Sequence, residues 1–447
     1  MLETKTLAAL GSALDALERE FAALPDVETA SPPLDAVLAE VAARLGDNYP
    51  YFHPLYAGQM LKPPHSVARA AYALATWINP NNHALDGGRA SSAMEKEAVA
   101  EIASMFGWRD HLGHLCGGGT MANLEALWIA GQLHPGKTIV ASEQAHYTHH
   151  RITSVLRLPF AEARCDNRGR MDAGALEKML EAGNVGCVVA TVGTTGTGSL
   201  DPLPQLLPLR QRYGFRLHVD AAYGGYYTLT ANLDGEARAV YDVIGEADSI
   251  VIDPHKHGLQ PYGCGCVLFR DPGVGAFYKH ESPYTYFTSS DLHLGEISLE
   301  CSRPGASAVA LWATQRLLPL VRGGEFAARL ESSRQAALAL YHRLRADARW
   351  VVPFAPELDI VVWAPRSPSA RRTSELSQRI FEAAARRNLH LALIRLPVRF
   401  FAPVAPAIST DQGTVLCLRS VLMKPEHLEW VGRIAEILNQ CAEEVMD

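Results

Sequence analysis

The stretch DPHKHGLQPYGCGC, in the second half of the chain, carries two sets of reactive side chains. Side-chain types that bind zinc in tetrahedral sites occur at four of its positions: His255, His257, Cys264 and Cys266. The stretch also holds a single lysine, Lys256, between the two histidines. A lysine amine can form a Schiff base with a carbonyl compound, so the stretch predicts either a metal site or a reactive lysine.

The composition limits what kind of protein this chain can be. A chain of 447 residues is too long to fold around one compact core, so we expect a large domain with one or two smaller ones. The net charge of −7, without a long run of one sign, argues against a nucleic-acid or anionic-membrane surface. No stretch approaches about 18 consecutive apolar residues, so no membrane span is expected. The N-terminal stretch MLETKTLAALGSALDALEREFAAL predicts an amphipathic helix and not a secretory signal.

Eight cysteines are spread along the chain without a regular spacing. In a chain of this length, that pattern predicts reduced thiols, most of them buried as small apolar residues. We therefore expect a cytoplasmic protein.

Short apolar runs alternate with helical segments in the middle of the chain. The runs are KTIVAS, GCVVATV, FRLHVD, SIVID and GCVLFR. Each is short enough to be a strand, and most are separated by enough residues for a helix. This rhythm predicts an α/β fold, with a mainly parallel central sheet and helices on both faces. We expect an N-terminal helical segment (1–75), a large domain (76–325) and a smaller C-terminal α+β domain (326–447).

Polar residues follow four consecutive predicted strands. EQAHYTHH follows KTIVAS, GTTGTGSLD follows GCVVATV, Asp220 ends FRLHVD, and PHKHG follows SIVID. In an open α/β sheet, ligands bind at the carboxyl ends of the strands. We therefore expect these segments to bring His146, Thr195, Asp220, His255 and Lys256 around one crevice.

Pyridoxal phosphate is the cofactor whose needs these residues meet together. Lys256 can form the Schiff base, and Asp220 can keep the ring nitrogen protonated. His146 can stack on one face of the ring, while Ala222 is small enough to let the ring lie close to its strand. The loop CGGGTMAN precedes a predicted helix, and its N–H groups and the Thr120 hydroxyl suit a phosphate. A metal site would leave these residues unexplained, so no metal is expected.

The chain resembles the group II pyridoxal-phosphate-dependent amino-acid decarboxylases of fold type I, which include aromatic amino-acid, glutamate and aspartate decarboxylases. The resemblance rests on stretches in the family's order: GGGTMANLEAL, SEQAHYT, GTTGTGSLDPL, HVDAAYGG, DPHKHG and LCLRSVLMKP. It implies that Lys256 is the Schiff-base lysine, that Asp220 lies at the ring nitrogen and that His146 stacks on the ring. The further cofactor contacts it implies are Gly119, Thr120, Thr195 and His255.

The resemblance also suggests contacts to the substrate. It implies that Arg419 binds the substrate carboxylate, although a strand arginine of this kind can also serve only in a salt bridge. Tyr56 and Gln59 lie in a segment similar to one that reaches the family's active site, so they either line the pocket or simply pack. ECSRPGASAVALW resembles the archaeal tyrosine/aspartate decarboxylases and sphingosine-phosphate lyases. Arg303 within it is therefore a candidate to bind phosphate or a substrate acid.

The implied activity is decarboxylation of an L-amino acid to its amine and carbon dioxide. A family loop after the lysine carries a tyrosine needed for clean decarboxylation, and Tyr284 and Tyr286 are the candidates here. The alternative is an aldehyde-forming decarboxylase or a carbon–carbon lyase of the same family. A transaminase matches the ordered motifs less well. A metal- or cofactor-binding scaffold without turnover would lack catalytic groups, whereas Lys256 and Asp220 are both present.

The remaining expectations concern assembly and neighbouring histidines. Active sites in this family form between two subunits, so the resemblance implies a homodimer with a small-molecule amino-acid substrate and no nucleic-acid or membrane partner. His149 and His150 stand at a helix start and are expected on solvated faces. His257 is expected to be structural.

Overall fold

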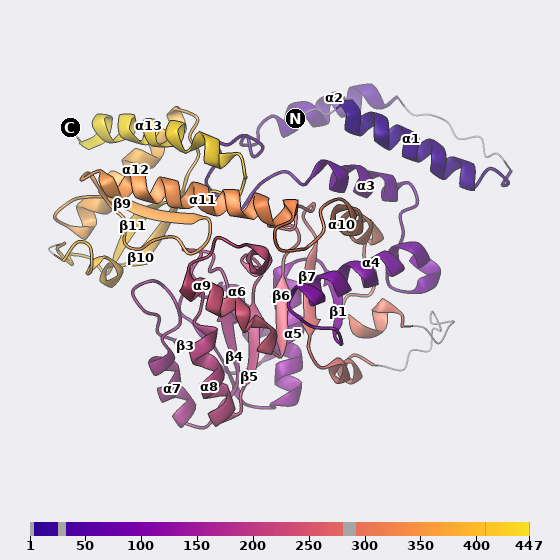
Figure 1. Cartoon of the computed structure of the whole chain (residues 1–447), viewed down its shortest axis with the longest axis horizontal. Coiled ribbons are helices and arrows are strands. Elements are labelled where there is room, and N and C mark those ends of the chain that lie inside the picture. The colour runs from indigo at the N-terminus through magenta and orange to yellow at the C-terminus, as the bar shows by residue number, and fades with distance from the viewer. Residues whose placement is uncertain (1–3, 26–32, 280–291, 407, 447) are drawn as a thin grey trace.

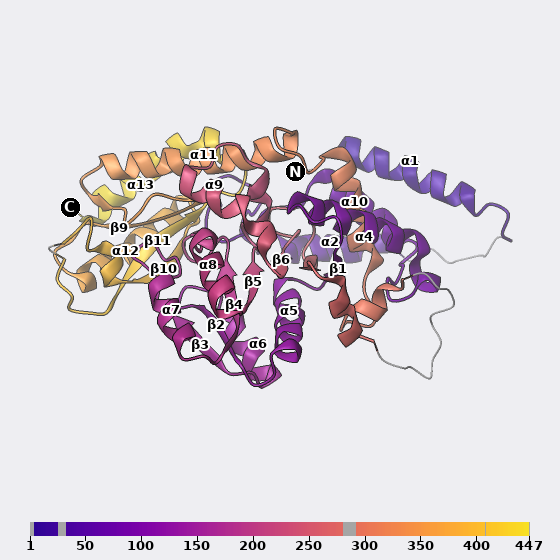
Figure 2. The same cartoon turned by 60° about the horizontal axis from the view of Figure 1, so that its bottom comes forward.

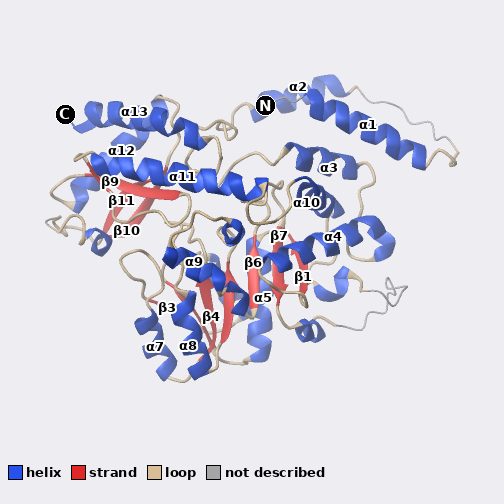
Figure 3. Cartoon of the chain, in the orientation of Figure 1, coloured by secondary structure: helices blue, strands red, loops and turns tan. Residues whose placement is uncertain are grey.

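The computed structural model describes residues 4–25, 33–279, 292–406 and 408–446, whose strands form two sheets (Figure 1 and Figure 3). The strands are β1 (Leu112–Cys116), β2 (Thr138–Ser142), β3 (Phe160–Ala163), β4 (Val185–Thr191), β5 (Arg216–Asp220), β6 (Ser249–Ile252), β7 (Gly265–Phe269), β8 (Trp350–Val351), β9 (Ile360–Pro365), β10 (Ala392–Pro397) and β11 (Thr414–Val421).

The α-helices are α1 (Thr4–Glu20), α2 (Leu34–Leu45), α3 (Ser66–Thr76), α4 (Leu85–Met105), α5 (Gly119–Leu133), α6 (Thr148–Leu156), α7 (Ala173–Glu181), α8 (Leu203–Tyr213), α9 (Gly235–Asp242), α10 (Gly305–Leu317), α11 (Glu325–Ala346), α12 (Ala370–Arg386) and α13 (His427–Met446). Short 3₁₀ helices are η1 (Gly225–Leu229), η2 (Ile244–Glu246), η3 (Pro272–Phe277), η4 (Leu294–Ile297) and η5 (Val398–Phe401).

The larger sheet has the strand order β1-β7-β6-β5-β4-β2-β3. The pairs β2–β3, β2–β4, β4–β5 and β5–β6 are parallel, whereas β7 runs antiparallel to both β1 and β6. The predicted mainly parallel sheet is therefore confirmed, with β7 as its antiparallel member.

Helices cover both faces of this sheet. Alternate side chains of each strand point to opposite sides, so they pack against different helices. Val188 and Ala190 of β4 share a buried cluster with Leu206 of α8. The intervening residues Cys187 and Val189 lie in another cluster, which also contains residues of α5 and α6. Burial on both faces explains why β4 reads as a continuous apolar run and not as an alternating one.

The smaller sheet is antiparallel, with the order β10-β11-β9-β8, and lies to one side of the larger sheet (Figure 2). One face, which includes Trp363 and Leu418, packs with Leu340 of α11, and with residues of α12 and α13. The opposite face, which includes Val362 and Cys417, belongs to the same buried cluster as the larger sheet. The predicted C-terminal α+β unit is thus joined to the larger sheet by continuous apolar packing.

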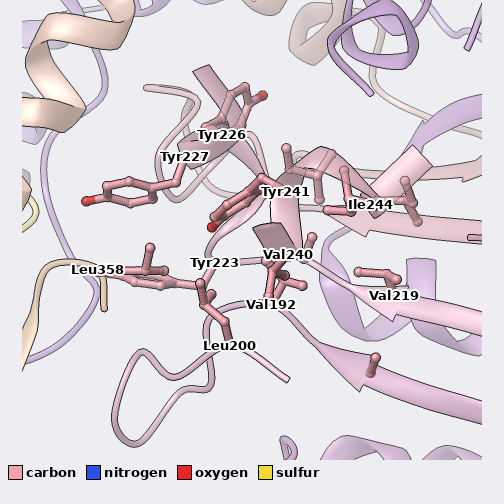
Figure 4. Packing of buried hydrophobic residues seen from close by; sticks show 14 of the residues in the cluster. Val192, Leu200, Val219, Tyr223, Tyr226, Tyr227, Val240, Tyr241, Ile244 and Leu358 are labelled. Atoms are coloured by element: carbon pink, nitrogen blue, oxygen red, sulfur yellow. The ribbon is translucent and has the colours of Figure 1, made fainter. Parts of the chain in front are cut away.

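A group of buried tyrosines fixes the chain that leaves β5 (Figure 4). Tyr223 and Tyr227 are 2% and 0% exposed, and the hydroxyl of Tyr241 donates a hydrogen bond to the carbonyl of Gly224 at 2.7 Å. Figure 4 shows Tyr223 and Tyr241 beside Val192, with Tyr226 and Tyr227 on the same side of the cluster. This packing holds the carboxyl end of β5, where Asp220 stands.

The N-terminal helices α1 and α2 contain no buried residue, and Figure 1 shows them along one edge of the chain. None of the helices in the described residues has the length and apolar character needed to cross a membrane.

Candidate active site

A cavity of about 510 Å³ opens at the carboxyl ends of β2, β4, β5 and β6. Its lining includes all of the residues that the sequence predicted to hold the cofactor: Gly119, Thr120, His146, Thr195, Asp220, Ala222, His255 and Lys256. The predicted convergence of four strand ends is therefore what the structure shows.

Lys256 stands in the turn after β6 and is held from two sides. Its ammonium nitrogen lies 3.0 Å from Oδ2 of Asp253, a buried carboxylate that also lines the cavity. On the other side, His257 is fully buried, and its Nε2 lies 3.3 Å from Oδ2 of Asp359, which precedes β9. The first contact positions the amine of Lys256 in the cavity, and the second holds the residue that follows it in the chain.

Asp220 faces Lys256 from the end of β5. Its Oδ1 accepts a hydrogen bond from the backbone N–H of Ala222 at 3.1 Å, and its Oδ2 lies 2.9 Å from Nε2 of His149. Burial alone would raise the pKa of Asp220, but the hydrogen bond and charge of His149, together with Lys256 and His218, hold that pKa well below its ordinary value. Asp220 is therefore a carboxylate, and it can only accept hydrogen bonds.

His146 follows β2 and lies at the cavity wall. Its Nδ1 is 2.8 Å from the hydroxyl oxygen of Thr148, which fixes the plane of the ring. Burial lowers the pKa of His146, although Asp220 acts in the opposite direction. A neutral, oriented imidazole is suited to stack on a flat aromatic ring.

The glycine-rich loop between β1 and α5 approaches its neighbours closely. Gly118 has a φ of 141°, in the region that favours glycine, and a Cβ on Gly265 would lie 2.5 Å from the Cα of Gly118. A Cβ on Gly119 would lie 2.7 Å from Oδ2 of Asp253. The loop leads directly into the N-terminus of α5, where the first N–H groups have no partner within the helix and attract an anion.

The predicted substrate residues lie outside the lining of this cavity. Arg419 is buried on β11 and donates to the carbonyl of Thr195 at 2.7 Å, which places it at the cavity edge, and to Oε1 of Gln59 at 3.3 Å. Tyr56 is buried, and its ring packs against Tyr51, with ring centroids 4.9 Å apart. Tyr56 therefore packs near the site and does not line it.

Arg303 does not reach the cavity. Its guanidinium is buried, with Nη1 2.7 Å from Oε1 of Glu95. It also donates to the carbonyl of Asn82 at 3.2 Å. With its donors directed at Glu95 and backbone carbonyls, Arg303 joins the segment before α10 to α4 and β1. This geometry gives no support to a role in binding phosphate or a substrate acid.

Two further expectations have different outcomes. Tyr284 and Tyr286 lie outside the described residues. The expectation that His149 is solvated is wrong: its side chain is 1% exposed, because the ring in the first turn of α6 lies against the carboxylate at the end of β5. His150, the next residue, is exposed as predicted.

Sequence reasoning also missed three acidic or basic residues that the structure brings to the site. Asp253 pairs with Lys256, His149 with Asp220, and Glu300 accepts a hydrogen bond from the N–H of Gly117 at 3.0 Å. The spacing of Asp253, three residues before Lys256 in one turn, was a usable signal for the first pair. Glu300 is 183 residues from its partner, and no local pattern indicates such a contact.

The residues present fit pyridoxal phosphate. An amine, a carboxylate kept in its charged form and a glycine loop at a helix N-terminus line one cavity. Lys256 would hold the aldehyde, Asp220 the ring nitrogen, and Gly119 and Thr120 the phosphate. The zinc-type side chains, by contrast, have separate surroundings: His257 lies against Asp359, and among the described residues no group of three His, Cys, Asp or Glu side chains could hold a metal ion.

Comparison with known proteins identifies the class. The family model described as "Pyridoxal-dependent decarboxylase conserved domain" matches residues 131–365. The chain therefore belongs to the pyridoxal-dependent decarboxylase family, whose cofactor is pyridoxal phosphate, and the resemblance found in the motifs is confirmed.

Curated relatives are named as amino-acid decarboxylases. L-tyrosine decarboxylase of Enterococcus faecium is 29% identical over 403 residues, covering 66% of this chain and 65% of that protein. L-aspartate decarboxylase of Thermococcus kodakarensis is 29% identical over 284 residues, covering 62% of this chain and 72% of that protein. The chain thus spans about two thirds of the length of these relatives.

Solved structures share the fold. Oryza sativa TDC with PLP and tryptamine superposes with a TM-score of 0.80 at 18% identity, covering 100% of this chain and 99% of that chain. Mouse CSAD in its apo form gives a TM-score of 0.77 at 21% identity, covering 96% and 91%. The predicted fold type I architecture is confirmed.

Proposed function

We propose that this chain decarboxylates an L-amino acid to the corresponding amine and carbon dioxide. The observation that carries the proposal is the placement of Lys256 and of the charged carboxylate of Asp220 in one cavity beside the glycine loop. Bound pyridoxal phosphate supplies an electron sink for the electrons of the bond that breaks. Lys256 holds the cofactor, Asp220 keeps a proton at its ring nitrogen, and His146 limits its tilt, so these residues orient the reacting bond.

A carbon-dioxide release assay tests this function. Purified protein with pyridoxal phosphate is given the amino acids one at a time, and products are read by mass spectrometry. We expect carbon dioxide with the matching amine, and the names of the relatives make tyrosine and aspartate the first substrates to try. Aldehyde with ammonia would instead support the oxidative alternative. Products cleaved between Cα and Cβ would support a lyase.

Arg419 is the residue we propose for binding the substrate carboxylate. Two of its nitrogens contact Thr195 and Gln59, while its buried Nε has no partner among the described residues. A guanidinium at the cavity edge with an N–H group that has no protein partner can donate a hydrogen bond to an anion.

Arg419→Met is expected to raise the KM for the amino acid about tenfold to a hundredfold, because a hydrogen bond to a charged group is lost. Steady-state kinetics at saturating cofactor measure this change. Arg395→Met, at an exposed position on β10, is the matched control and should leave KM unchanged. An unchanged KM in the Arg419 variant would remove Arg419 from the substrate site.

We also propose that the protein is a homodimer with its active site at the subunit interface. Five apolar side chains at helical spacing on α2 are exposed in the single chain: Leu34, Val37, Leu38, Val41 and Leu45. An uncovered stripe of this kind favours burial against another chain. Light scattering of the purified protein measures the mass, and a monomeric mass would contradict the proposal.

We also propose a division into residues 1–75, 76–325 and 326–447, which is supported by the placement of the two sheets within the second and third segments. A cytoplasmic location is supported by eight free cysteines, of which seven are buried.

A further inference from the structure

His149 is not among the residues that line the cavity, but it contacts the carboxylate of Asp220. Its Nε2 lies 2.9 Å from Oδ2 of Asp220, and the two side chains are 1% and 7% exposed. Because the carboxylate of Asp220 can only accept, His149 must donate this hydrogen bond from Nε2. In the described part of the chain, its buried Nδ1 has no hydrogen-bond partner, so the ring directs its one side-chain hydrogen bond at Asp220.

The position of His149 is set by the same turn that positions His146. The N–H of His149 donates to the carbonyl of His146 at 3.1 Å, and the hydroxyl of Thr153 donates to the carbonyl of His149 at 2.9 Å. One turn therefore carries a ring that lines the cavity and a ring that lies behind the acid opposite Lys256. Movement of this turn would change both contacts together.

Several charged or titratable groups face Asp220, and they do not replace His149. His218 lies on the same strand, but its ring nitrogens contact Ser249 and Asn123. Lys256 lies across the cavity and pairs with Asp253. The donors that directly contact the carboxylate oxygens, among the described residues, are the N–H of Ala222 and Nε2 of His149.

We propose that His149 is a positioning residue that holds Asp220 charged and aimed into the cavity, and that it thereby sets the affinity for pyridoxal phosphate. This inference rests on the proposed use of the cavity for that cofactor. It concerns binding to the ring nitrogen and needs no particular amino-acid substrate. Loss of the donor would leave one carboxylate oxygen in a buried place without its partner, which weakens the charged form and lets the side chain turn.

The test is cofactor binding to the purified apoprotein, measured by titration with pyridoxal phosphate and quenching of tryptophan fluorescence. His149→Phe removes the donor and keeps a ring of similar size, and we expect affinity to fall about tenfold to a hundredfold. His149→Gln keeps an amide N–H at a similar reach and should recover most of the affinity. His150→Phe, at the exposed neighbour, is the matched control and should bind as the wild type does.

A double-mutant cycle separates this role from a purely structural one. If His149 acts through Asp220, then His149→Phe should change cofactor affinity little when Asp220 is already alanine. An equal loss in both backgrounds, or wild-type affinity in His149→Phe, would overturn the proposal. Because no amino acid is added, these outcomes are independent of whether decarboxylation is the reaction. If neither the wild type nor the His150→Phe control binds the cofactor, the proposed function itself fails.

Discussion

Lys256→Ala is expected to abolish turnover and to remove the visible absorbance of covalently held cofactor. The amine of Lys256 enters the cavity beside Asp253, and the other residues named in its lining offer no second amine. Without it, pyridoxal phosphate can be held only by non-covalent contacts. The substrate amine then has no bond between lysine and cofactor to displace. We expect the rate to fall by at least about 10³-fold, which corresponds to about 4 kcal/mol of barrier.

The measurements are carbon-dioxide release and the absorbance spectrum of the reconstituted protein. Lys137→Ala is the matched control, since Lys137 is exposed just before β2, at the end of the strand opposite to the cavity. The control should retain both turnover and absorbance. Full activity in Lys256→Ala would exclude this lysine from the chemistry and would reopen the assignment of the cavity.

Most of the central sheet could be predicted because its strands are short apolar runs buried on both faces. KTIVAS, GCVVATV, FRLHVD, SIVID and GCVLFR correspond to β2, β4, β5, β6 and β7. The antiparallel direction of β7 was not predicted, because direction depends on the short connection through Lys256 and not on the composition of the strand. β1, β3, β8 and β10 were also missed. β3 and β8 have only four and two residues, β10 carries Arg395 in mid-strand, and β1 contains a glycine, which is uncommon in strands.

The site was predictable to the extent that it follows from strand ends. Residues after β2, β4, β5 and β6 meet because the carboxyl ends of parallel strands share one edge. The contact of His149 with Asp220 was not predictable, because it joins residues 71 positions apart in the chain. For Arg303 the error is the opposite one. Its motif predicted a contact with a ligand, but in the fold its guanidinium is paired with the buried Glu95.

Asp220→Asn is expected to lower the decarboxylation rate by about 10²- to 10⁴-fold, or about 3 to 5 kcal/mol of barrier. Asparagine keeps the size of the side chain and can still accept from the N–H of Ala222, but it carries no charge to hold a proton at the ring nitrogen. Although burial acts to raise it, the pKa of Asp220 is held below its ordinary value by His149 and Lys256. The acid therefore stays charged as pH falls, down to values below the ordinary range for aspartate, so any loss of activity in mild acid must come from another group.

Asp220→Glu distinguishes charge from shape. It restores the negative charge but makes the side chain one methylene longer in a cavity that Ala222 and Lys256 also line. If charge is what matters, this variant should recover part of the rate that Asp220→Asn loses, measured as kcat with the cofactor saturating. If both variants are equally slow, the placement of the carboxylate within hydrogen-bond reach matters as much as its charge. A near-wild-type rate in Asp220→Asn would show that Asp220 does not hold the ring nitrogen. The contact with His149 predicts the intermediate result, since a longer side chain cannot keep both the 2.9 Å contact behind it and its original position in the cavity.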